Sequence, residues 1–151
     1  MDNQGSSKLS WVVGIIAVIV IGWFLSADSK SAIESGPIKI GVLLPLTGDA
    51  AVYGEGGRNV YQLAVEEINK AGGVNGRPIE LIIEDSKCNG KDAASAAQKL
   101  VNVDKVEVIL GGFCSGESIA STPVAAEAKV AIFSPGSSSP DLTGISPYFF
   151  R

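Results

Sequence analysis

The sequence of 151 residues contains no histidine. This absence removes the usual general base, the usual partner of a catalytic nucleophile and the commonest metal ligand, so it argues against catalysis and metal binding. The 12 basic and 16 acidic residues give a net charge of −4, and no cluster of Lys or Arg could neutralise a run of phosphates. We therefore expect no nucleic-acid partner, no metal or other cofactor, and no enzymatic activity.

The longest stretch without charge lies near the N-terminus, over residues 9–27. Its length of about 19 residues, at helical rise, matches the hydrocarbon thickness of a bilayer. Trp11 and Trp23 lie near its ends, where amphipathic rings prefer the membrane interface, and Lys8 supplies the positive charge expected on the cytoplasmic side. The sequence thus predicts a cytoplasmic N-terminus over residues 1–8, then a transmembrane anchor or signal segment, and an extracytoplasmic remainder.

Two other interpretations of this segment stay open beside a retained anchor. The best cleavage candidate for a signal peptide is Leu25-Ser26-Ala27, but its leucine is large for the −3 position, so we favour retention. A buried core helix is the third interpretation. No cysteine directly follows the apolar run, so a lipid anchor has no attachment point. Residues 28–36 are polar and small, which predicts a linker, and the folded part is expected over residues 37–151.

Beyond the linker, apolar β-rich runs alternate with helical patterns. The runs predict buried strands at residues 38–44, 79–85, 106–110 and 130–133, with a fifth beginning at residue 148. Apolar residues at three- and four-residue spacing predict a helix that includes Val60, Leu63, Ala64, Ile68 and Ala71 and stops at Gly72-Gly73. A second helix is predicted over residues 92–103 with Ala93, Ala97, Leu100 and Val101 facing inward, and a third over residues 115–129, where Pro123 should kink it or mark a late start.

This regular alternation predicts an α/β domain with a parallel sheet and helices on both faces. Ligands of such sheets bind beyond the carboxyl ends of the strands, near the point where the strand order reverses. About 115 residues remain to build this domain, which is enough for one modest layered structure. The loops expected at the binding edge cover residues 45–57, 86–90, 111–116 and 134–143.

Four long motifs in collinear order carry a resemblance to a known family. They are IKIGVLLPLTGDAAVYGEGGRN (38–59), LAVEEINKAGGVNGRPIELIIEDSKC (63–88), AAQKLVNVDKVEVILGGFCSG (96–116) and FSPGSSSPDLT (133–143). Together they resemble the type I periplasmic-binding-protein superfamily, and within it the leucine/isoleucine/valine-binding branch. The resemblance implies an open sheet of order 2-1-3-4-5. It also implies that residues 37–151 are a partial N-terminal lobe whose second lobe is missing, as in a truncated gene.

The same resemblance implies a function. Proteins of this branch are extracytoplasmic components of ABC importers, which capture branched-chain or similar amino acids and deliver them to permease subunits. The ligand docks on the first lobe and the second lobe closes over it by a hinge motion. An extracellular ligand-sensing domain of a receptor is the alternative, although the sequence contains no cytoplasmic output domain, which favours transport.

The two cysteines are predicted to lie close together. Cys88 follows the second predicted strand and Cys114 follows the third, so their loops overhang the same edge of a sheet ordered 2-1-3. Export makes a disulfide chemically reasonable, and the resemblance implies a bridge at these positions. Two free buried cysteines are the alternative.

An amino-acid ligand brings a carboxylate and an ammonium, and both need partners in a closed site. The segment 114–116 lies where the third predicted helix begins, so its free backbone N–H groups and the Ser115 hydroxyl can face an anion. Residues 136–139 follow the fourth strand and offer hydroxyls to a carboxylate and carbonyls to an ammonium. These two segments are therefore the candidate binding loops.

The resemblance assigns roles to four residues. It implies that Ser115 and Ser138 hold the α-carboxylate, that the backbone of Gly136 meets the α-amino group, and that Tyr53 flanks the ligand side chain. Structural alternatives stay open: Ser115 as an N-cap only, residues 137–139 as a turn only, and Tyr53 as loop packing only. Ser138 lacks the methyl group of the threonine often found there in the family, which bears on affinity and ligand class.

Two glycine motifs suggest other chemistry. Residues 112–116 (GFCSG) match the G-x-C-x-G form of a nucleophile elbow between a strand and a helix, which makes a hydrolase of the dienelactone type the enzymatic alternative. Its thiol would need a histidine to activate it, and the sequence has none. Residues 54–57 (GEGG) lie about ten residues beyond the first strand, which is too far for a dinucleotide-binding turn.

Overall fold

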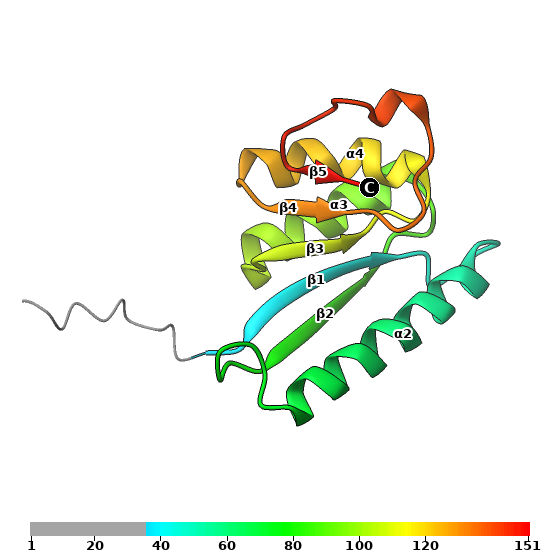
Figure 1. Cartoon of the computed structure of the whole chain (residues 1–151). Helices are drawn as coiled ribbons and strands as arrows, with labels where there is room; N and C mark the ends of the chain where they lie inside the picture. Colours follow the sequence, from blue (N-terminus) through cyan, green and yellow to red (C-terminus); the bar gives the residue numbers. More distant parts are fainter. Residues whose placement is uncertain (1–35) are drawn as a thin grey trace, which may run out of the picture. The chain divides into compact units, whose positions relative to one another are not determined.

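The computed structural model describes residues 36–151. The predicted membrane segment at residues 9–27, the stretch before it and nearly all of the predicted linker lie outside the described residues. Within residues 36–151, no helix has both the length and the apolar character that a membrane crossing requires. Figure 1 shows this part of the chain as one sheet with helices against it.

Five parallel strands form the sheet in the order β2-β1-β3-β4-β5, which confirms the expected order. The strands are β1 (Ile38–Leu44), β2 (Ile79–Asp85), β3 (Val108–Gly111), β4 (Ala131–Phe133) and β5 (Phe149–Phe150). The connecting helices are α2 (Ala51–Lys70), α3 (Gly90–Lys99) and α4 (Ser115–Glu127), with a π-helical turn at Leu100–Asp104 and a 3₁₀ turn at Pro140–Leu142. The chain is thus an α/β domain, as predicted.

The strand β1 lies inside the sheet because its apolar residues can be buried on both faces. It pairs with β2 along its whole length and with β3 from Ile40 to Leu43. Val42, Leu43 and Leu44 at its carboxyl end are at most 1 % exposed. Since every strand pair is parallel, all carboxyl ends reach the same edge, and the loops that follow them meet there.

The main hydrophobic core lies between the sheet and the pair α3 and α4. The four residues predicted to face inward from the second helix are all buried, which confirms that assignment. The alanines of α3 let it pack closely against α4 and the sheet, because small side chains allow helix axes to approach. The core cluster comprises Leu43, Ala96, Ala97, Leu100, Val101, Val106, Ile109, Ala125 and Ile132.

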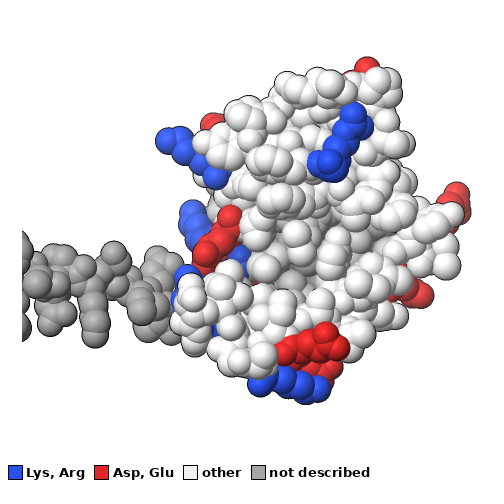
Figure 2. Space-filling view, viewed as in Figure 1, with Lys and Arg blue, Asp and Glu red and all other residues white. Residues whose placement is uncertain are grey.

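The opposite face of the sheet is covered over β1 and β2, by α2 (Figure 1). Only Gly54 of this helix is buried, and the apolar residues Val60 and Leu63 are 64 % and 59 % exposed. Phe133 on β4 and Phe150 on β5 stack with their ring centroids 4.9 Å apart, and both side chains are exposed. Figure 2 shows that the hollowed middle of the molecule in this view carries few charged side chains.

The helices α2, α3 and α4 differ in their bounds from the sequence-based expectation. The helix α2 begins at Ala51, so residues 51–57 are helical and do not belong to the expected loop. Gly54 explains this start, because an added Cβ would overlap the carbonyl oxygen of Pro45. The helix axis therefore comes close to the start of the preceding loop, and this contact offsets the low helix propensity of glycine.

The other two differences lie in α3 and α4. The helix α3 begins at Gly90, since the Asn89 side chain caps it by accepting from the N–H of Asp92 at 2.9 Å. It gives way to the π-helical turn after Lys99, and β3 therefore begins two residues later than expected. The helix α4 begins at Ser115, as predicted, so the alternative of a late start is wrong; it continues through Pro123 and ends at Glu127, two residues before the predicted end.

Candidate functional site

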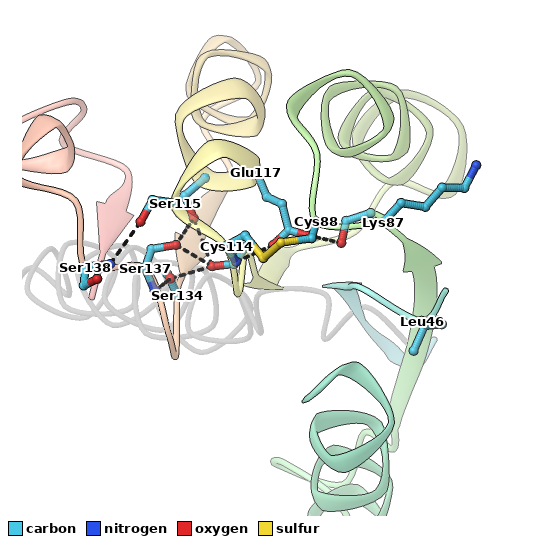
Figure 3. Close-up of a disulfide and its surroundings, with 12 residues drawn as sticks. Leu46, Lys87, Cys88, Cys114, Ser115, Glu117, Ser134, Ser137 and Ser138 are labelled. Carbon is cyan, nitrogen blue, oxygen red and sulfur yellow. Dashed lines mark hydrogen bonds between the residues drawn. A yellow bond between two sulfur atoms is a disulfide. The ribbon is translucent and has the colours of Figure 1, made fainter. Parts of the chain in front are cut away.

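The candidate site lies at the carboxyl edge of the sheet, where the loops after the strands converge (Figure 3). A disulfide joins two of these loops, between Cys88 after β2 and Cys114 after β3, with 5.5 Å between the Cα atoms. The predicted pairing is therefore confirmed, and the alternative of two free cysteines is wrong. Because Cys114 is bonded to sulfur, it offers no thiolate, and the hydrolase alternative loses its nucleophile.

Glu117 makes a second connection between the same two loops. Its side chain is fully buried, and one carboxyl oxygen accepts the N–H of Cys114 at 2.6 Å while the other accepts the hydroxyl of Ser86. Glu117 is the third residue of α4, where a carboxylate can cap the helix start and interact favourably with the helix dipole. The first turn of α4 is thus fixed both covalently and by hydrogen bonds.

Ser115 and Ser138, two of the predicted ligand residues, lie together. The Ser115 hydroxyl oxygen accepts the backbone N–H groups of Ser138 at 3.2 Å and Ser139 at 3.1 Å. Among residues 36–151, its hydrogen has no acceptor, and neither do the N–H groups of Ser115 and Gly116. The start of α4 therefore presents several unused donors at the sheet edge, which is a suitable environment for an anion.

Gly136 lies beside this polar group. Its backbone lies against the carbonyl group and the ring of Phe113 in the loop after β3. The carbonyl oxygen of Gly136 accepts no hydrogen bond from any of the described residues, so it is available to a ligand donor. The predicted residue is thus close to Ser138 in the chain and close to the β3 loop in space.

Tyr53 lies in the first turn of α2, and its ring stacks on Phe113 with centroids 5.2 Å apart and planes at 18°. The expectation that Tyr53 lies in a loop is wrong, although it does reach the site. Phe113 links Tyr53 to Gly136, although no motif in the sequence predicted a role for it. The two rings border an apolar hollow of about 230 Å³, which is also lined by Leu44, Gly56, Gly57, Val60, Tyr61 and Pro135.

Asp85 at the end of β2 organises the loop between β1 and α2. Its carboxylate accepts the N–H of Leu46 at 2.8 Å, that of Lys87 at 3.0 Å and the hydroxyl of Thr47 at 2.5 Å. Desolvation raises the pKa of Asp85, but these hydrogen bonds outweigh it and hold the pKa below its ordinary value. Asp85 therefore acts as an ionised loop anchor. Within residues 36–151, no three His, Cys, Asp or Glu side chains converge as metal ligands.

The residues at this edge form two adjoining parts, a set of polar donors and an aromatic wall, which suit a small amphipathic solute. Comparison with known proteins agrees with a protein that binds a small solute. The sequence model of the periplasmic binding protein family matches residues 37–151. The chain is similar to the leucine-, isoleucine-, valine-, threonine- and alanine-binding protein of Pseudomonas aeruginosa, with 34 % identity over 142 residues, covering 93 % of this chain and 36 % of that protein.

Two solved structures share the fold. One is the branched-chain amino acid transporter substrate binding protein LivJ from Streptococcus pneumoniae in complex with isoleucine, with TM-score 0.73 and 38 % identity over 76 % of this chain and 33 % of that one. The other is a solute binding protein of an ABC transporter from Rhodopseudomonas palustris BisB5 in complex with 3,4-dihydroxy benzoic acid, with TM-score 0.69 and 30 % identity over 75 % and 31 %.

These matches assign the chain to a family. The chain belongs to the periplasmic binding protein family, and its similarities lie in the branch of leucine/isoleucine/valine-binding proteins. Members of this family are solute-binding proteins and not enzymes. The chain spans about a third of the length of the relatives and solved structures that it matches.

Proposed function

We propose that this chain supplies the first lobe of an extracytoplasmic solute-binding component of an ABC importer, and that its solute is an amino acid with an apolar side chain. The observation that carries the proposal is the position of Ser115 at the start of α4, where its hydroxyl oxygen lies 3.2 Å from the backbone nitrogen of Ser138. The stacked rings of Tyr53 and Phe113 are the second element of the argument.

The ligand carboxylate is assigned to the start of α4. The N–H groups of Ser115 and Gly116 and the Ser115 hydroxyl hydrogen are available to it, and the Ser138 hydroxyl lies on the neighbouring turn. Hydrogen bonds to a charged group each contribute about 1.5 to 3 kcal/mol. Two or three of them suffice to orient the carboxylate, and the helix dipole adds a favourable term.

The ammonium is assigned to the carbonyl oxygen of Gly136, which accepts no hydrogen bond from the described residues; the Cα of the same residue lies beside Phe113. The ligand side chain then extends toward the ring pair formed by Tyr53 and Phe113. An apolar side chain is favoured there, because the hollow beside these rings is lined mainly by apolar side chains and glycines.

Transport is favoured over sensing because the matched relatives are named as amino-acid-binding and transporter proteins. In this proposal the extracytoplasmic lobe is tethered to the membrane by residues 9–27, and the ligand-loaded protein docks on permease subunits. An aromatic carboxylate is the second candidate ligand. The stacked rings favour it, as does the Rhodopseudomonas palustris neighbour with bound 3,4-dihydroxy benzoic acid.

The test is an NMR titration of the ¹⁵N-labelled full chain, which detects weak binding residue by residue. The ligands are L-leucine, isocaproate, which lacks the ammonium, isoamylamine, which lacks the carboxylate, and 3,4-dihydroxybenzoate. We expect L-leucine to shift the amide signals of Ser115, Gly116 and Ser138, isocaproate to bind more weakly, and isoamylamine not to shift them. Saturation by dihydroxybenzoate alone would replace the amino acid with the second candidate, and no shift at these amides with any ligand refutes the site.

A further inference from the structure

A buried cluster of hydroxyl groups lies directly behind the candidate site. The carbonyl oxygen of Gly112, the first residue after β3, accepts from three serine side chains: Ser118 at 3.1 Å, Ser134 at 2.7 Å and Ser137 at 2.6 Å. Ser118 is 0 % exposed and Ser137 is 6 % exposed. Figure 3 shows Ser134 and Ser137 on one loop beside the start of helix α4, which carries Ser115.

The hydrogen bonds in this cluster depend on one another. A carbonyl oxygen has two lone pairs, so three donors exceed its regular capacity. The hydroxyls of Ser118 and Ser137 lie 2.8 Å apart, which lets Ser118 donate to Ser137 while Ser137 donates to Gly112. Ser134 takes the second lone pair and also accepts the N–H of Ser137 at 3.0 Å. Ser137 is therefore the serine that contacts every other member of the cluster.

The cluster connects the end of β3, the helix α4 and the loop after β4, which together carry the candidate binding residues. Gly112 directly follows β3, Ser118 lies one helical turn after Ser115 in α4, and Ser137 directly precedes Ser138. The Gly112 residue has a positive φ of 72°, and an added Cβ there would overlap the Ser118 hydroxyl, so the close contact requires glycine. The turn at residues 136–139 is thus fixed by the buried hydrogen bonds of Ser137, the residue next to Ser138.

We infer that Ser137 is a positioning residue of the ligand site. Its buried hydroxyl holds the turn against Gly112 and Ser118, and thereby aims the N–H groups of Ser138 and Ser139 at the Ser115 oxygen. It does not touch the ligand. The inference rests on the proposed function for its consequence in ligand binding, and on the geometry alone for its effect on the turn.

The matched control is Ser121, which lies in the same helix. It is 0 % exposed, and its hydroxyl donates to the carbonyl of Glu117 at 2.8 Å within α4, with no hydrogen bond to the turn. The variants Ser137→Ala and Ser121→Ala therefore remove the same buried group from different surroundings. The full chain is measured in three ways: solvent-exchange rates of the Ser138 and Ser139 amides, thermal midpoint, and the L-leucine dissociation constant from the NMR titration.

In Ser137→Ala we expect amide exchange at Ser138 and Ser139 to be about fivefold faster, as the loss of one ordinary hydrogen bond implies, while amides of β1 and β3 keep their rates. We also expect about fivefold weaker leucine binding. In Ser121→Ala the two amides and the leucine affinity should stay at wild-type values, whatever happens to the thermal midpoint.

Two results separate this inference from the proposed function. Faster exchange at Ser138 and Ser139 without any leucine binding in the wild type supports the positioning role and refutes the proposed ligand. Unchanged exchange in Ser137→Ala overturns the positioning role, and so does an increase that Ser121→Ala reproduces. A double variant that combines Ser118→Ala with Ser137→Ala should resemble the Ser137 variant, because both changes break the same cluster; additive changes in exchange also overturn the inference.

Discussion

Replacing Cys88 and Cys114 with serine removes the covalent link between the loops after β2 and β3. The two residues are 26 positions apart, and a crosslink of this span lowers the conformational entropy of the unfolded chain by the equivalent of about 3 to 4 kcal/mol at 25 °C. The folded state should change little, because Glu117 still joins the same loops through the Ser86 hydroxyl and the N–H of residue 114. The loss of stability should therefore come mainly from the unfolded state.

The expected change in thermal stability follows from the size of the domain. For about 115 residues, the entropy of unfolding is about 0.24 kcal/mol/K, so the double variant Cys88→Ser/Cys114→Ser should unfold about 12 to 17 °C below the wild type. Circular dichroism during heating of the full chain measures this difference. A dithiol reductant should lower the midpoint of the wild type by a similar amount and leave that of the double variant unchanged.

Two outcomes would refute this reasoning. A midpoint difference of a few degrees would mean that the crosslink does not constrain the unfolded chain. A large difference accompanied by loss of near-ultraviolet dichroism at low temperature would mean that Glu117 does not hold the loops in the folded state. Urea unfolding provides an independent check, since the slope with denaturant should increase when the unfolded chain loses its crosslink.

Three further predictions concern other parts of the lobe. Gly54→Ala should lower the free energy of unfolding, measured in urea, by about 2 kcal/mol or more, because the added Cβ overlaps the Pro45 carbonyl. Gly56→Ala, whose Cβ has open space, should raise it by up to about 1 kcal/mol. Equal effects of the two variants would contradict the assigned contact. The lowered pKa of Asp85 means that its stabilising contribution is present above about pH 4 and is lost as the pH falls through the folded-state pKa. The difference in unfolding free energy between the wild type and Asp85→Asn should therefore shrink on acidification. A difference that does not depend on pH would refute this prediction. Phe113→Ala should weaken leucine binding about fivefold in the NMR titration, whereas Phe133→Ala, from the exposed stacked pair, should not; equal losses would argue against the aromatic wall.

The apolar runs of the sequence predicted the first two strands well, whereas the order of the sheet followed from the family resemblance. The first two strands have the predicted bounds, because each apolar run is long and is bounded by proline or carboxylates. The start of α2 could not be predicted in the same way. Its first two turns contain three glycines within residues 54–57, and they are helical because Gly54 fits against the Pro45 carbonyl, which is a tertiary contact.

The candidate site could be predicted in part. Ser115 and Ser138 were selected through resemblance, and the hydrogen bond between the Ser115 oxygen and the Ser138 N–H brings them together. Phe113 carried no recognisable signal, because it is a single aromatic residue between a glycine and a cysteine in a short loop. The buried cluster around Gly112 was also missed, since serines in a loop are ordinarily solvated and only the packing of α4 against the turn buries them.

The central claim is that the start of α4 binds the carboxylate of an amino acid. The most direct test compares the L-leucine affinity of Ser115→Ala with that of the wild type, with Ser95→Ala as the control, because the Ser95 hydroxyl bonds only to its own helix at the carbonyl of Lys91. The account predicts that Ser115→Ala weakens binding about tenfold or more, as loss of a hydrogen bond to a charged group implies, and that Ser95→Ala has no effect. Wild-type affinity in Ser115→Ala would contradict the account.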